Sequence, residues 1–249
     1  MKNTARLNFQ IGLVIVLLSV ALWVLLLFNP GQVMEVSHCQ MTMAGPSAAS
    51  LDMLLQMNPF SDMMLGWTLM VFAMMLPKLI SPIQYIFSRS FRRQRISSSL
   101  LFVFGYALVW IAIGVVMNGL ILAANFYFPQ SFVPAILIGV IAIFWQFTPI
   151  KQRFLNRGHY HRPLAAFGLA AKRDALSFGL AHGFWCFCSG WALMLFPMLM
   201  PVGHNAAMLA VTLIMVSEHM EHPRIPKWYF GTRLKLLRIV WAQARLRLN

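Results

Sequence analysis

Acidic residues are scarce in this chain, and charged residues of any kind are few. Only 6 of the 249 residues are Asp or Glu, and charged residues make up 10% of the chain, whereas hydrophobic residues make up 59%. A soluble domain needs a larger polar surface than this composition supplies. The sequence also contains no G-x-S-x-G, H-E-x-x-H or phosphate-binding glycine-rich motif, so no enzyme class is indicated.

The sequence contains several long apolar segments. Six of them are apolar enough to cross a bilayer, because about 20 apolar residues span the ~30 Å hydrocarbon layer. They lie at about 9–28, 63–82, 98–125, 132–150, 175–200 and 205–222. Six spans use about half of the chain and leave no room for a second folded domain. The sequence therefore predicts an all-α, polytopic membrane protein built as a six-helix transmembrane bundle.

Basic residues are missing from every second connection between these segments. The connections 29–62, 126–131 and 201–204 contain no Lys or Arg, and all 20 Lys and Arg residues lie elsewhere. Basic loops resist translocation, so we expect both termini on the cytoplasmic side of the inner membrane and 29–62 outside. The net charge of +14 then reflects topology and contact with anionic inner-leaflet lipid, and we expect no nucleic-acid partner.

Two segments outside the spans have amphipathic patterns. Residues 48–57 are predicted to form a short interfacial helix with leucines on one face. In the basic cytoplasmic tail, 223–249, Leu234, Leu237 and Trp241 recur at helical spacing, with the arginines largely off that stripe. This pattern predicts a basic amphipathic helix that lies on the inner leaflet and is not a seventh span.

Cysteine is also scarce, with three residues, but methionine is abundant, with eighteen. The extracytoplasmic loop 29–62 holds the first sulfur cluster, at His38, Cys39, Met41 and Met43. In an extended segment the sulfur-bearing side chains of this cluster point the same way. Thiol, thioether and imidazole are donors that Cu(I) prefers and hard cations do not. The alternative is a methionine-rich loop in which Cys39 is free or disulfide-bonded.

The second cluster lies in the segment 63–82. At 100° per residue, Met63, Met70 and Met74 fall within about 40° of one another on a helix. Met74 is followed by Met75, so this segment offers thioether ligands near its middle. The alternative is that the methionines are pliable packing residues, since Met often fills irregular gaps in cores.

The third cluster lies in the segment 175–200. His182 and Cys186 are at positions i and i+4, so they share a helix face and are candidates to bind one ion together. Cys188 is rotated by about 200° from Cys186 on an ideal helix, and it joins them only if the helix breaks, for example at Gly190. The alternative is a packing helix with buried thiols and one hydrogen-bonded histidine.

Glu218 is a candidate because a carboxylate inside a membrane span is costly and usually has a partner or a function. It is predicted to lie in the same layer as His182 and to orient that ring as a hydrogen-bond acceptor. The alternative is an interfacial pair of Glu218 and His222 in contact with water.

Sequence elements at 67–77, 105–114, 146–155 and 179–194, together with Glu218, form a set of motifs in a fixed order. Over about residues 60–222 this set resembles the family of predicted metal-binding integral membrane proteins known as domain of unknown function 2182. Where the family has a cysteine doublet, this chain has Ser189 and Gly190, and Cys188 stands at a glycine position. The resemblance implies a metal-binding membrane protein and names no reaction.

Three functions are therefore open. The first is a copper-handling membrane protein with His182, Cys186 and Met74 or Met75 as ligands and the loop cluster as the uptake site. Because Met74 and Cys186 are both predicted near the midplane, we expect Met74 or Met75 to face His182, Cys186 or Cys188. The second function is a structural or assembly subunit that binds other membrane subunits without metal chemistry of its own. The third is a membrane oxidoreductase.

Overall fold

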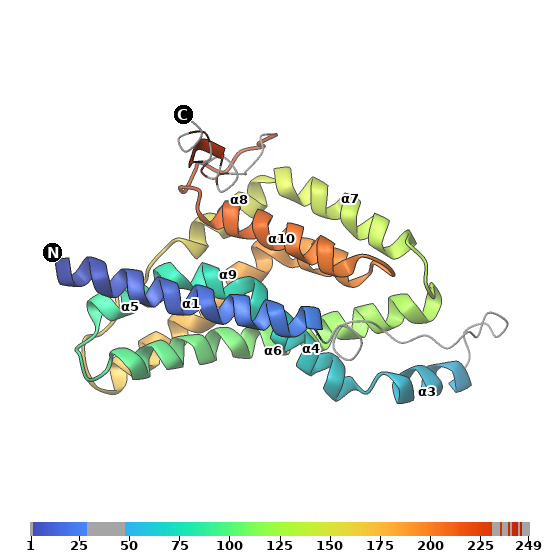
Figure 1. Cartoon of the computed structure of the whole chain (residues 1–249), viewed down its shortest axis with the longest axis horizontal. Coiled ribbons are helices and arrows are strands. Elements are labelled where there is room, and N and C mark those ends of the chain that lie inside the picture. The colour runs from blue at the N-terminus through green and yellow to red at the C-terminus, as the bar shows by residue number, and fades with distance from the viewer. Residues whose placement is uncertain are drawn as a thin grey trace.

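The computed structural model describes residues 2–28 and 48–230 and a few positions of the tail, at 235, 239, 241–243 and 245. Within these residues every regular element is a helix, which confirms the all-α prediction (Figure 1). The elements are α1 (Lys2–Phe28), α3 (Ala48–Met57), α4 (Phe60–Met75), the 3-10 helix η1 (Leu76–Leu79), α5 (Ile80–Arg89), α6 (Arg95–Tyr127), α7 (Val133–Phe147), α8 (Pro149–Gly158), α9 (Gly168–Met198) and α10 (His204–His219). A helix thus forms over the segment 48–57, whereas the amphipathic helix predicted in the tail falls mostly outside the described residues.

Four helical runs are long and apolar enough to cross a membrane: α1, α6, α9 and the run from α4 through η1 to α5. The α7–α8 pair also qualifies if its two helices, which are bent by 73°, form one span. The sixth predicted span coincides with α10, which has 16 residues. At 1.5 Å per residue such a helix is about 24 Å long, shorter than the ~30 Å hydrocarbon layer. Four to five spans therefore meet the criteria of length and composition, and a sixth stays a prediction.

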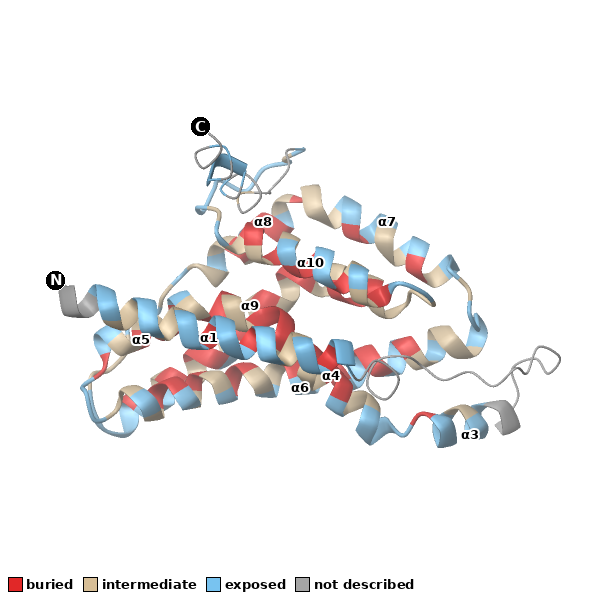
Figure 2. Ribbon diagram, viewed as in Figure 1, coloured by how far each residue is buried: buried red, intermediate tan, exposed pale blue. Residues whose placement is uncertain are grey.

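Much of the outer surface of the helices is exposed (Figure 2), and many of the exposed side chains are large and apolar. Large exposed side chains line α1, α6 and α7, among them Leu17, Phe28, Val116, Ile136 and Val140. In the span of α1, only 17% of the most apolar window is buried within the protein. Soluble monomers rarely expose such extended apolar surface.

A proline breaks the second helical run next to the core. Pro77 lacks a backbone N–H, and its ring clashes with the carbonyl four residues earlier, so a regular α-helix does not continue through it. α4 ends at Met75, and the chain makes one 3-10 turn before α5 begins. This turn carries Lys78 and Leu79 into the interior, where both are buried.

Helix α9 is the centre of the bundle and packs against α6, α7, α8 and α10. Its closest approach is to α6, where glycines take the place of larger side chains. A Cβ atom built on Gly179 would lie 2.1 Å from the carbonyl oxygen of Phe102, and one on Gly105 would lie 2.6 Å from that of Leu176. Small residues allow such close backbone contact between apolar helices. The contact brings the buried face of α6 against Cys186.

The bend between α7 and α8 follows from Thr148 and Pro149. The hydroxyl of Thr148 accepts a hydrogen bond from the backbone N–H of Lys151 at 3.2 Å and caps α8. Pro149 occupies the first turn, where its missing N–H costs nothing. The bend turns the side chain of Lys151 into the interior, where it is 0% exposed.

Candidate metal site

The thiol of Cys186 lies buried where α9 meets η1 and α6. Its Sγ atom accepts a hydrogen bond from Nζ of Lys78 at 3.2 Å and from the hydroxyl of Tyr106 at 3.4 Å. The Sδ atom of Met75 lies 3.9 Å from the same sulfur. We call Met75, Lys78, Tyr106 and Cys186 the thiol site. Two hydrogen-bond donors and one thioether thus surround the Cys186 sulfur atom.

The predicted contact between the second and fifth apolar segments is confirmed by the 3.9 Å distance between Met75 and Cys186. Met70 and Met74 belong to the same buried core, with 0% and 1% of their surface exposed. Further buried methionines, which were not among the predicted ligands, come from α6, α9 and α10: Met117, Met194, Met208 and Met215. The sequence shows only that these residues are methionines. Whether each one is buried depends on how the helices pack.

His182 lies one turn before Cys186 on the buried face of α9 and is 3% exposed. Aromatic rings surround it, with centroids 5.8 Å away for Phe102 and 6.0 Å away for Tyr106. Within the described part of the chain, its Nε2 atom has no hydrogen-bond partner. An unpaired buried polar atom is uncommon in native structures, so this nitrogen is available to a ligand.

The helix break that Cys188 would need to join the other ligands is absent, since α9 runs without interruption from Gly168 to Met198. Cys188 therefore stays about 200° around the helix from Cys186 and is only partly buried. Gly190 serves packing instead, because a Cβ atom there would lie 2.1 Å from Cε of Met215.

Glu218 is buried, as 3% of its surface is exposed, and it has a cationic partner. Nζ of Lys151 lies 2.8 Å from Oε2 of Glu218, and the Gln146 side chain hydrogen-bonds to both residues. We call Gln146, Lys151 and Glu218 the buried ion pair. Lys151 is the partner that a buried carboxylate was expected to have. The contacts of Glu218 do not include His182, so they give no support to its expected role as the hydrogen-bond acceptor for that ring.

A row of imidazole rings leads from the thiol site toward α8, and the sequence motifs did not reveal it. The ring of His182 is 6.1 Å from that of His219, which stacks at 4.9 Å on the ring of His159. Both nitrogens of His159 lie 2.8 Å from carbonyl oxygens, those of Leu155 and His219. His159 is thus held by backbone, whereas His182 is not.

Few other ligands are available in the core. Among the described residues, no three His, Cys, Asp or Glu side chains are grouped closely enough to hold one ion. A metal site here depends on methionine sulfur beside one thiol and one imidazole, a donor set that suits a soft ion such as Cu(I) and not Mg²⁺ or Ca²⁺. The loop cluster at 38–43 lies outside the described residues.

Comparison with known proteins bears on this donor set. No curated protein and no solved structure matches the chain. The family model described as PpoB2, copper chaperone, matches residues 64–237. The match supports a relation to copper. The matching family model has a different name from the family that the sequence motifs resemble. It includes the thiol site and the buried ion pair and begins after the loop cluster. Because the match covers well over half of the chain, this protein belongs to the PpoB2 copper chaperone family.

Proposed function

We propose that this chain is a membrane-embedded copper chaperone that holds Cu(I) between Cys186 and Met75 and passes it to a partner protein. The observation that carries this proposal is the pair of sulfur atoms 3.9 Å apart in the core. A metal–thiolate bond is about 2.3 Å long for zinc, so two sulfur atoms on one ion lie at most about 4.6 Å apart. The two sulfurs are thus already close enough to share a soft ion.

His182 is the third ligand in this proposal. It follows the i, i+4 spacing with Cys186, and Nε2 lacks a partner among the described residues. A buried polar atom left unpaired costs about 1–3 kcal/mol. A ligand at Nε2 would remove that cost, which supports a role for His182 when copper is bound.

The membrane location rests on the apolar helices and the apolar outer faces of α1, α6 and α7. The charge pattern of the connections favours an inner-membrane protein with both termini in the cytoplasm. In this arrangement, His38, Cys39, Met41 and Met43 would collect copper outside, and the basic tail would contact anionic inner-leaflet lipid. Other membrane proteins are then candidate partners for copper transfer.

The test is copper retention by the purified full chain in detergent. Wild-type protein loaded with Cu(I) and washed should retain a stoichiometric amount, measured by elemental analysis. Cys186→Ser removes the thiolate and should weaken retention by about tenfold or more, equivalent to at least about 1.4 kcal/mol.

Cys188→Ser is the matched control, because it removes a thiol from the opposite side of the same helix. It should retain copper as the wild type does, and both variants should elute as the wild type does in gel filtration. Equal retention by wild type and Cys186→Ser would contradict the proposal and favour a structural or assembly subunit without metal chemistry.

A further inference from the structure

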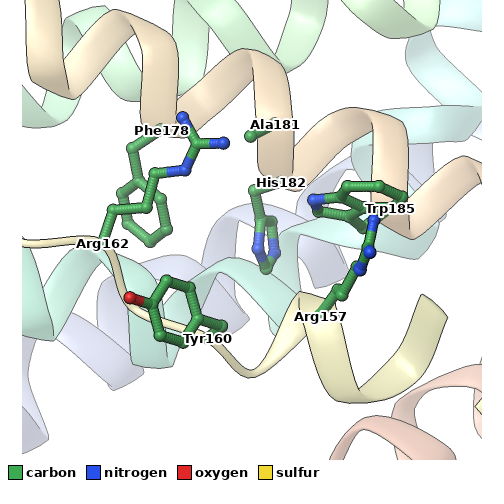
Figure 3. A pocket seen from close by; sticks show the side chains of 7 residues that line it. All are labelled: Arg157, Tyr160, Arg162, Phe178, Ala181, His182 and Trp185. Carbon is green, nitrogen blue, oxygen red and sulfur yellow. The ribbon is translucent and has the colours of Figure 1, made fainter. Parts of the chain in front are cut away.

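A cavity of about 340 Å³ opens between α8, the connection 159–167 and α9 (Figure 3). It is lined by Arg157, Tyr160, Arg162, Phe178, Ala181, His182 and Trp185. Sites for small ligands have volumes of about 300–1,000 Å³, with apolar walls and a few convergent polar groups. This cavity has that size and that mixture of groups.

The cavity carries positive charge. Arg157 and Arg162 extend toward it on either side of the His182 ring (Figure 3), and none of the described residues that line it is acidic. Burial lowers the pKa of the neighbouring His161 below its ordinary value, so this ring is neutral at pH 7. The positive charge at pH 7 therefore comes from the two guanidinium groups.

Within the described residues, both guanidinium groups keep N–H donors without a partner. The guanidinium carbon of Arg157 lies 4.6 Å from the ring centroid of Trp185, a cation–π contact that leaves N–H groups at the edge of the plane. Arg162 donates from one terminal nitrogen to the hydroxyl of Ser177 at 3.3 Å. Because a guanidinium has five N–H donors, most remain available for an anion.

His182 forms the inner wall of the cavity. Its side chain is 3% exposed, and in the described structure Nε2 has no partner. Figure 3 shows the ring directed into the space between Tyr160 and Arg157. A buried, unpaired nitrogen on a ring that lies between two arginines is a second sign of a ligand site, independent of the charge.

We propose that this cavity binds an anionic ligand through a phosphate or carboxylate group. The anionic oxygens accept hydrogen bonds from Arg157 and Arg162, and from the Nε2–H of His182 while this nitrogen holds no metal ion. The apolar part of the ligand contacts Phe178 and Trp185. The site does not depend on copper binding at Cys186. Two sources present this chemistry, an anionic lipid headgroup and a small soluble anion. Because Nε2 of His182 can bind copper or donate to an anion but not both at once, an occupied cavity would remove His182 from the copper ligands at Cys186.

The experiment uses the purified full chain in detergent and two probes. Native mass spectrometry measures how much phosphatidylglycerol the chain retains, with phosphatidylcholine as the neutral lipid. Isothermal titration calorimetry measures binding of inorganic phosphate. The variants are Arg162→Gln and the double variant Arg157→Gln/Arg162→Gln. Arg153→Gln is the matched control, because Arg153 is an exposed arginine of α8 that does not line the cavity.

Wild type and Arg153→Gln should bind the anionic probe equally, and the double variant should bind it at least about tenfold more weakly, as expected for loss of two charged donors. Arg162→Gln should be intermediate, and it keeps the contact between Arg157 and Trp185. Selective retention of phosphatidylglycerol identifies a headgroup site, and binding of phosphate alone identifies a soluble anion. If neither probe binds, or if Arg153→Gln weakens binding as much as the double variant does, the proposal is overturned.

Discussion

Two lysines lie almost completely inside this protein, and they have different kinds of partner. Lys151 is 0% exposed and pairs with the Glu218 carboxylate at 2.8 Å, with Gln146 bonded to both. Lys78 is 3% exposed, and its ammonium faces the thiol of Cys186 at 3.2 Å. Over the described ranges 5–28 and 51–230, no carboxylate forms an ion pair with Lys78.

The difference between the two partners separates a structural ion pair, Lys151 with Glu218, from a pair suited to metal transfer, Lys78 with Cys186. The buried ion pair joins α8 to α10 through the 2.8 Å contact between Lys151 and Glu218 and so holds the two helices in one arrangement. A thiol changes its charge when it loses a proton or binds a metal. Lys78 thus places a positive charge where a metal ion would bind the sulfur. In a medium of low dielectric this charge opposes a Cu(I) ion, so we expect a copper site that also releases its ion.

The largest expected effect is the loss of stability when the buried ion pair is broken. Glu218→Gln leaves the Lys151 ammonium buried without its carboxylate, and breaking such a pair costs about 3–5 kcal/mol. We expect a much lower midpoint of thermal unfolding in detergent, measured by tryptophan fluorescence. A variant as stable as the wild type would show that Lys151 and Glu218 do not hold the fold.

Glu221→Gln is the control for this change. Glu221 pairs with Arg224 at 2.9 Å, but the arginine is 44% exposed. Exposed pairs contribute about 0–1 kcal/mol, so stability should hardly change.

The second prediction concerns Lys78. Lys78→Met removes the positive charge and adds a thioether, so Cu(I) retention should rise by about tenfold, or about 1.4 kcal/mol. Competition with a Cu(I) chelator measures the change. Lys78→Arg keeps the charge and should not raise retention. If Lys78→Met loses copper while staying folded, Lys78 helps to bind the ion and does not oppose it.

The smallest expected effect concerns the thioether. Met75→Leu nearly conserves volume and should change stability by less than about 1.5 kcal/mol. It removes one sulfur from the thiol site, so copper retention should fall about threefold to tenfold, or by about 0.7–1.4 kcal/mol. Met74→Leu is the matched control from the same turn of α4 and should leave retention unchanged. If Met74→Leu loses more copper than Met75→Leu, Met74 is the ligand.

Sequence patterns located the helices well because helix formation in apolar segments depends on local composition. The face shared by His182 and Cys186 also followed from spacing alone, since the helical period is fixed. Gly190 was a candidate for a helix break, but the helix continues through it. Glycine is tolerated inside a packed helix when a neighbour needs the space, and here Met215 fills it. That requirement comes from α10 and cannot be read from α9.

The sequence by itself determined the helical class, the soft donor set and the need of Glu218 for a partner, because each follows from residue type or local periodicity. Only the tertiary structure decided which groups meet. Lys151 reaches Glu218 through the bend at Thr148, and Lys78 reaches Cys186, 108 positions away in the chain, through the 3-10 turn at Pro77. Such contacts depend on how helices distant in sequence pack together, as α6 and α9 do where their glycines allow close backbone contact.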